Sequence, residues 1–129
     1  MKQIFIEGDI KKYKTFVKPE DVAAFQGMTV HNVYSTFALA RDIEWTTRQF
    51  VLDINDEDEE GIGTFLEIHH RGPAFVGEEL TFTGRFERLT GDEVQCTYEA
   101  HVGQRIIATG RTCQRILKRE KIKLIFNHG

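Results

Sequence analysis

The pattern of apolar and polar positions divides most of the chain into one long helix followed by four strands. Between residues 36 and 52, apolar side chains recur at the three- and four-residue spacing of an α-helix. With Thr36 at the centre of the apolar face, the residues that share this face are Leu39, Ala40, Ile43, Thr47, Phe50, Val51 and Ile54. The residues outside it are Arg41, Asp42, Trp45, Arg48, Gln49 and Asp53. The pattern predicts a helix that buries one face and is capped by Ser35 or Thr36.

Strand candidates follow at residues 61–71, 78–90, 93–102 and 105–117, where the period changes to two. The predicted inner faces of the second and third strands consist of Leu80, Phe82, Gly84, Phe86, Val94, Cys96, Tyr98, Ala100 and Val102. Short turn sequences at 90–92 and 103–104 make the last three strands an antiparallel meander. A long helix followed by such a sheet predicts an α+β fold in which the sheet curls around the helix.

The remaining segments carry weaker patterns. The N-terminal third has no clear period, except that residues 18–25 resemble a short helix with Pro19 near its first turn. Residues 118–129 form a basic tail whose structure the pattern does not predict. No repeat or linker interrupts the chain, and the acidic run from Asp53 to Glu60 is interpreted as a solvated loop. We therefore expect one domain over residues 1–129.

Charge and composition exclude several classes of function. A net charge of −3 gives no general attraction to nucleic acid or to an anionic membrane. No signal peptide and no apolar stretch of about 20 residues is present, so a cytoplasmic protein is expected. Cys96 and Cys113 are too few and too widely spaced for a disulfide framework or a four-ligand zinc site. We expect them to pack as reduced, apolar side chains, and we expect no metal site.

The first strand carries two adjacent histidines, of which only one can face the sheet interior. His70 shares a face with Ile62, Thr64, Leu66 and Ile68, whereas His69 falls on the other face. His70 is therefore expected to be desolvated. It also precedes the irregular segment from Arg71 to Gly77, where Pro73 cannot continue a central strand. A core histidine and a functional histidine both fit this position.

Glu44 lies at the edge of the buried helix face, which is an unusual place for a carboxylate. A surface ion pair with Arg48 is one interpretation. A partly desolvated general base is the other. Thr36 lies eight residues earlier, and a capping role alone is enough to explain it.

Together these residues resemble the hot-dog thioesterases, and most closely the fluoroacetyl-CoA thioesterase branch. The resemblance covers residues 33–117 and depends on the spacing of Ser35-Thr36 from Glu44-Trp45 and on a strand that runs from Gly63-Thr64 to His70. It implies a catalytic group of Thr36, Glu44 and His70. It also implies substrate contacts at Gly63 and Thr64, and a homodimer with its sheets joined edge to edge.

The resemblance implies hydrolysis of an acyl-CoA without any cofactor beyond the CoA of the substrate. Arg71, Arg111 and Lys118 are candidates to hold the CoA phosphates. The fluoroacetyl-specific enzyme carries a phenylalanine lid where this chain has Gly27 and Val30. A different short or medium acyl group is therefore expected. A non-catalytic acyl-CoA-binding module or sensor, and a hydratase or dehydratase using His31, remain as alternatives.

Overall fold

The computed structural model describes residues 1–25 and 28–127, with the side chains of residues 24–30 left out. The strands are β1 Ile10–Phe16, β2 Val22–Phe25, β3 Met28–Tyr34, β4 Glu59–His70, β5 Glu79–Thr90, β6 Glu93–Val102 and β7 Arg105–Lys118. The helices are the 3-10 turn η1 Pro19–Asp21, the long helix α1 Thr36–Ile54 and the C-terminal helix α2 Arg119–Phe126.

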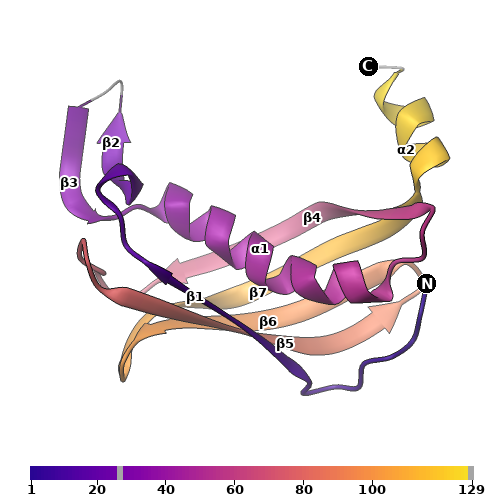
Figure 1. Ribbon diagram of the computed structural model, residues 1–129, viewed down its shortest axis with the longest axis horizontal. Helices are drawn as coiled ribbons and strands as arrows, with labels where there is room; N and C mark the ends of the chain where they lie inside the picture. The colour runs from indigo at the N-terminus through magenta and orange to yellow at the C-terminus, as the bar shows by residue number, and fades with distance from the viewer. Residues whose placement is uncertain (26–27, 128–129) are drawn as a thin grey trace.

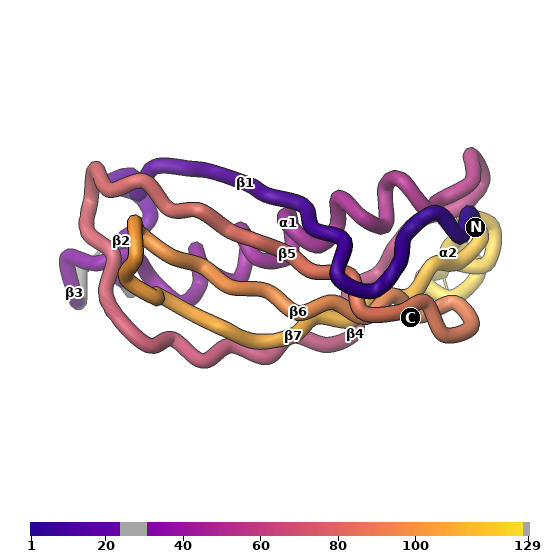
Figure 2. The backbone as a smooth tube through the Cα atoms, turned by 90° about the horizontal axis from the view of Figure 1, so that it is seen from below, coloured from indigo at the N-terminus to yellow at the C-terminus, as the bar shows by residue number. Residues whose placement is uncertain are grey.

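Five antiparallel strands form a sheet in the order β1-β5-β6-β7-β4, and β2 and β3 form a separate hairpin. Figure 2 shows the five strands side by side in this order, with α1 along one face of the sheet. The meander of β5, β6 and β7 and the α+β fold are confirmed. Neither helix is long and apolar enough to cross a membrane in the described part of the chain.

The core lies between α1 and the concave face of the sheet. The helix buries Leu39, Ile43, Phe50, Val51 and Ile54 as predicted. All predicted inner residues of β5 and β6 are buried too, except Val102, which is half-buried. Removing a large side chain such as Phe50 from water contributes roughly 2–3 kcal/mol, so this helix face is a main source of stability.

Two predictions for the flanking segments are wrong, and the C-terminal tail, for which the pattern predicted no structure, is helical. The N-terminal third is not irregular, because β1 pairs with β5 and the β2–β3 hairpin follows. Residues 18–25 form only the 3-10 turn η1 before β2 begins. The tail forms helix α2, which projects away from the sheet (Figure 1).

The sheet depends on a close approach at Gly110. A Cβ atom built there would overlap the carbonyl oxygen of Glu67 on β4, and backbone cannot move aside cheaply. We expect Gly110→Ala to lower the free energy of unfolding by about 3 kcal/mol in urea titrations. Gly84→Ala, whose nearest neighbours are side-chain atoms at 3.4–3.5 Å, serves as the control and should cost less than about 1 kcal/mol. Equal losses of unfolding free energy in the two variants would contradict the close approach at Gly110.

Candidate active site

Thr36 and His70 meet where α1 begins and β4 ends. Ser35 is the N-cap, and its Oγ accepts a hydrogen bond from the Ala38 N–H at 3.0 Å, which fixes the first turn of the helix. The Thr36 Oγ1 atom lies 3.0 Å from His70 Nδ1, within hydrogen-bonding distance. Both side chains are exposed, so the expected desolvation of His70 is wrong for the single chain. Because α1 only begins at Thr36, the helix does not cover the end of β4.

A β-bulge sets which residues of β4 face the helix. Gly63 pairs with the buried Gln114, but the register then shifts so that Leu66 pairs with Thr112 and His70 with Ala108. The prediction that Ile62 and Thr64 share a face with His70 is therefore wrong, whereas the faces assigned to His70 and His69 are confirmed. Ile62 pairs with Arg115 on the outer face, and the Thr64 hydroxyl donates to the Cys113 carbonyl oxygen at 3.2 Å.

The bulge places Gly63 beside Glu44. A Cβ atom at Gly63 would lie 3.4 Å from the Glu44 Oε1 atom, so only a glycine leaves open space in front of this carboxylate. Arg48 instead donates from Nη1 to the Gly61 carbonyl oxygen at 3.2 Å. Among the described residues, the Glu44 carboxylate makes no ion pair, which removes the surface-pair interpretation. Glu44 is exposed rather than partly desolvated.

The three predicted catalytic residues thus lie at two places along one seam between α1 and β4. Thr36 and His70 occupy one end of the seam, and Glu44 lies over Gly63 further along it. Eight residues of helix separate Thr36 from Glu44 by about 12 Å along the axis. The chain supplies a hydroxyl, an imidazole and a carboxylate on one open surface, but it does not gather them into one hydrogen-bonded group.

Of the three basic candidates for CoA phosphate binding, only Arg71 is close to this site along the chain, and its side chain lies on the outer face of the sheet, where His69 pairs with Thr109. Arg71 follows His70, and its Nε donates to Thr109 Oγ1 at 2.9 Å. Arg111 lies opposite Glu67 in the register of β7 against β4, on the outer face of the sheet. Lys118 lies at the other end of β4, in an ion pair with Asp58 at 3.0 Å. The structure therefore separates Arg111 and Lys118 from the Thr36–His70 pair.

A buried polar network supports the start of α1, and the sequence pattern did not indicate it. Asp42, predicted to lie outside the buried face, is only 5% exposed and accepts a hydrogen bond from the Tyr34 hydroxyl. Arg41 donates to Asp42 at 3.1 Å and to Asp21 at 3.2 Å. Burial, and then the hydrogen bond to Asp42, raise the pKa of Tyr34, so the hydroxyl stays protonated as a donor.

The Asp21 residue of this network is itself only 4% exposed. Its carbonyl oxygen accepts from the Ser35 N–H at 2.9 Å. Hydrogen bonds, first to Asp42 and also to Asp21, raise the pKa of Arg41, which keeps its charge. The network therefore ties η1 and β3 to the cap that precedes Thr36.

Comparison with known proteins identifies the family. Residues 17–120 match the family model described as fluoroacetyl-CoA-specific thioesterase, FlK. A hypothetical protein of Thermus thermophilus, described as a thioesterase superfamily member, is 31% identical, with a TM-score of 0.93 over 98% of this chain and 94% of that one. A comparison with curated protein sequences finds no match.

Two more distant structures share the fold. The fluoroacetyl-CoA thioesterase FlK is 17% identical, with a TM-score of 0.89 over 98% of each chain. A hot-dog-like protein from Thermanaerovibrio acidaminovorans is 20% identical, with a TM-score of 0.86 over 96% of this chain and 93% of that one. The chain therefore belongs to the fluoroacetyl-CoA-specific thioesterase family, and it is an acyl-CoA thioesterase with the hot-dog fold.

Proposed function

We propose that this thioesterase hydrolyses a short or medium acyl-CoA at the seam between α1 and β4, with Glu44, His70 and Thr36 as its reactive groups. The observation that carries this proposal is the 3.0 Å contact between Thr36 and His70 on the same open surface as Glu44 and Gly63. FlK structures with fluoroacetate and CoA, from a protein 18% identical to this one, support a CoA-linked substrate.

In the proposed reaction, Glu44 takes a proton from water, and the oxygen of that water adds to the thioester carbonyl carbon. The C–S bond then breaks, CoA leaves as the thiolate and takes up the proton that Glu44 accepted, and the free acid is the second product. The β4 bulge takes Thr64 out of regular strand pairing beside Gly63, so backbone here can hold the carbonyl oxygen. Arg71, the residue after His70, is the proposed contact for the CoA moiety, and no step needs a further cofactor.

His70 and Thr36 orient the acyl group at the other end of the seam. The contact between Nδ1 and the hydroxyl fixes the plane of the imidazole ring. The exposed ring can then donate a hydrogen bond toward the oxygen on which negative charge develops. This division of roles makes Glu44 the proton acceptor and His70 the electrostatic partner.

A panel of acyl-CoA esters from two to eight carbons, with detection of free thiol, tests this function. We expect thiol release with a maximum among the short or medium chains. Tight acyl-CoA binding without thiol release would favour a non-catalytic binding module. Addition of water to an enoyl-CoA without thiol release would favour a hydratase. Either of these results would contradict the proposal.

Thr36 offers a graded prediction. Thr36→Ala removes the hydroxyl that contacts His70, and we expect kcat to fall about tenfold because the imidazole loses one orienting partner. Thr36→Ser keeps the hydroxyl and should stay within about threefold of the unchanged protein. Steady-state kinetics on the best acyl-CoA measure both values. Equal losses of kcat in the two variants would show that the Thr36 hydroxyl has no part in the mechanism.

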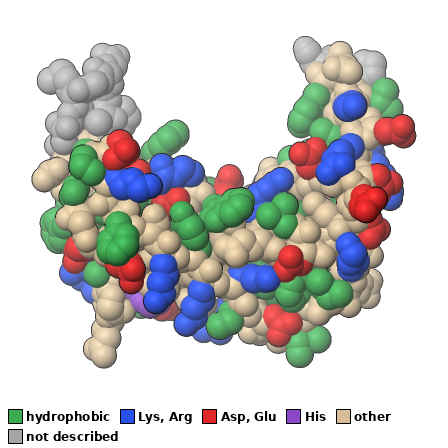
Figure 3. Space-filling view, viewed as in Figure 1, with side chains coloured by type: hydrophobic (Ala, Val, Ile, Leu, Met, Phe, Trp, Pro, Cys, Tyr) green, Lys and Arg blue, Asp and Glu red, His purple; other side chains and the backbone are tan. Residues whose placement is uncertain are grey.

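We also propose that two copies pair through the β4 edge of the sheet. The other edge, β1, carries Lys11, Lys12 and Lys14, and lysines on an edge strand oppose further pairing. β4 has no lysine or arginine. The β2–β3 hairpin and α2 both project past β4 and leave a saddle between them (Figures 1 and 3).

The saddle exposes apolar side chains that a second copy would cover. On α1, Phe37 is 86% exposed and Trp45 is 45% exposed, and on α2 Phe126 is 66% exposed. Hydrophobic side chains lie among charged ones on the floor of the saddle in Figure 3. We expect light scattering at micromolar concentration to give twice the 14.9 kDa of one chain. A mass of one chain would contradict the proposed homodimer.

The proposal places the reaction in the cytoplasm. Cys96 and Cys113 are both free thiols, as a reducing compartment requires. Burial raises the pKa of Cys96 to about 12, so this thiol packs as an apolar group and takes no part in the chemistry.

A further inference from the structure

A hollow of about 610 Å³ opens beside Thr36, between the first turns of α1 and the segment where η1 passes into β2. We call it the Thr36 hollow. Val22, Ala23 and Ala38 contribute apolar surface to its lining. Its volume falls within the range of small-molecule sites, and its lining suits a short alkyl chain. A thioester held between Thr36 and Glu44 can extend its acyl chain into this space.

The charged wall of the Thr36 hollow contains more acids than bases. Among the described residues, its charged lining consists of Glu20, Asp21 and Arg41. The Arg41 guanidinium already donates to Asp21 and to Asp42, which lies behind it. Two buried carboxylates therefore share one cation. An incoming carboxylate would meet a guanidinium that already donates to two carboxylates, so it would gain little from this cation and would be repelled by both acids.

We infer that the Thr36 hollow binds the acyl chain and that its wall of Glu20, Asp21 and Arg41 selects an uncharged alkyl group over one that ends in a carboxylate. This inference rests on the proposed thioesterase site, and it adds the class of acyl group. The repulsion acts at the far end of the chain and leaves the thioester chemistry unchanged. It therefore predicts selectivity between substrates rather than the rate of the chemical step.

Pentanoyl-CoA and glutaryl-CoA form the test pair, since both have five-carbon acyl chains and only the second ends in a carboxylate. We expect kcat/KM for pentanoyl-CoA to exceed that for glutaryl-CoA at least about tenfold, after subtraction of spontaneous hydrolysis. Asp21→Asn removes one negative charge and keeps one side-chain oxygen for Arg41, whereas the Lys18 N–H, which bonds to the other Asp21 oxygen, loses its acceptor. In this variant the ratio of kcat/KM for pentanoyl-CoA to kcat/KM for glutaryl-CoA should fall at least about threefold.

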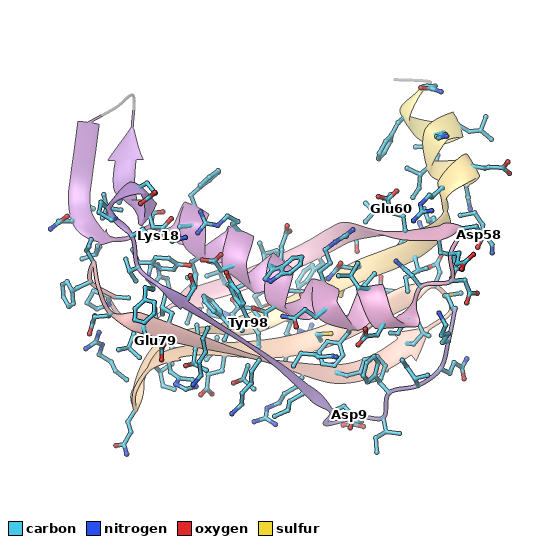
Figure 4. All side chains as sticks on the ribbon, in the orientation of Figure 1. Asp9, Lys18, Asp58, Glu60, Glu79 and Tyr98 are labelled. Atoms are coloured by element: carbon cyan, nitrogen blue, oxygen red, sulfur yellow. The ribbon has the colours of Figure 1, made fainter. Side chains whose placement is uncertain are left out.

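Two further variants complete the experiment. Glu20→Gln changes an exposed residue of the wall, so it should fold normally and narrow the ratio about twofold. Asp58→Asn makes the same change in net charge at the opposite end of the molecule from Lys18 (Figure 4) and should leave the ratio unchanged.

The outcomes separate this inference from the proposed function. Equal values for the two substrates, or a ratio that neither wall variant changes, would overturn the inference while hydrolysis itself stands. Absence of thiol release from both substrates and from the whole acyl-CoA panel would instead overturn the proposed function, and the inference with it.

Discussion

Replacing Glu44 by glutamine is expected to lower kcat for acyl-CoA hydrolysis at least about 100-fold. The amide keeps the size of the side chain but cannot accept a proton from water. Glu44 is exposed and makes no ion pair within the described part of the chain, so the fold should not depend on its charge. Steady-state thiol release measures kcat, and the urea midpoint checks stability.

Asp53→Asn is the matched control for Glu44→Gln. Asp53 is an exposed acid on the same helix, paired with Lys11 at 2.6 Å and distant from Thr36. Its replacement should leave kcat within about twofold. A Glu44→Gln protein that keeps more than a tenth of the activity would show that another group activates the water.

Replacing His70 by asparagine is the second large effect, again a loss of at least about 100-fold in kcat. Asparagine can still contact Thr36, but its amide cannot become positively charged, so it cannot act as the electrostatic partner of the developing negative charge. His70 is exposed, and among the residues that the structure describes its side chain has Thr36 alone as a hydrogen-bond partner, at 3.0 Å, so the loss should appear in activity rather than in stability.

The chain provides its own control in the neighbouring histidine. His69 lies on the outer face of β4, with its Nε2 3.6 Å from Glu67 Oε1, and it points away from the site. His69→Asn should change kcat by less than about twofold. Similar losses in the two variants would indicate that the end of β4 matters only structurally.

Local periodicity predicted the central elements because their buried faces are regular. In β5 and β6 every second residue packs on α1, and α1 buries most of the face that the wheel indicated. The helix face is wider than predicted on one side, where Asp42 and Thr46 are buried. Asp42 is buried because Tyr34 and Arg41 satisfy it, and a helical wheel contains no information on such partners.

The flanking elements were missed for a different reason. β1 is an edge strand whose residues alternate between exposed and half-buried, so its apolar signal is weak. The bulge at Thr64 depends on the register against β7, which the sequence of β4 alone does not show. Without the bulge Gly63 appears to lie on the outer face. The structure instead brings it against Glu44.

For the site, sequence periodicity identified His70 and indicated Glu44, whereas Thr36 came from family resemblance. The structure joins Thr36 to His70 but leaves Glu44 about two helical turns away. The prediction for Gly27 and Val30 at the lid concerns side chains outside those that the structure describes. The family and the fold are therefore established.

Thiol release by the purified protein and by a Glu44→Gln/His70→Asn double variant tests the central claim most directly. The unchanged protein should release one CoA thiol for each short or medium acyl thioester consumed. The double variant should fold normally and show no turnover above the spontaneous rate. A folded double variant that still hydrolyses the thioester at the original rate would contradict the proposed catalytic group.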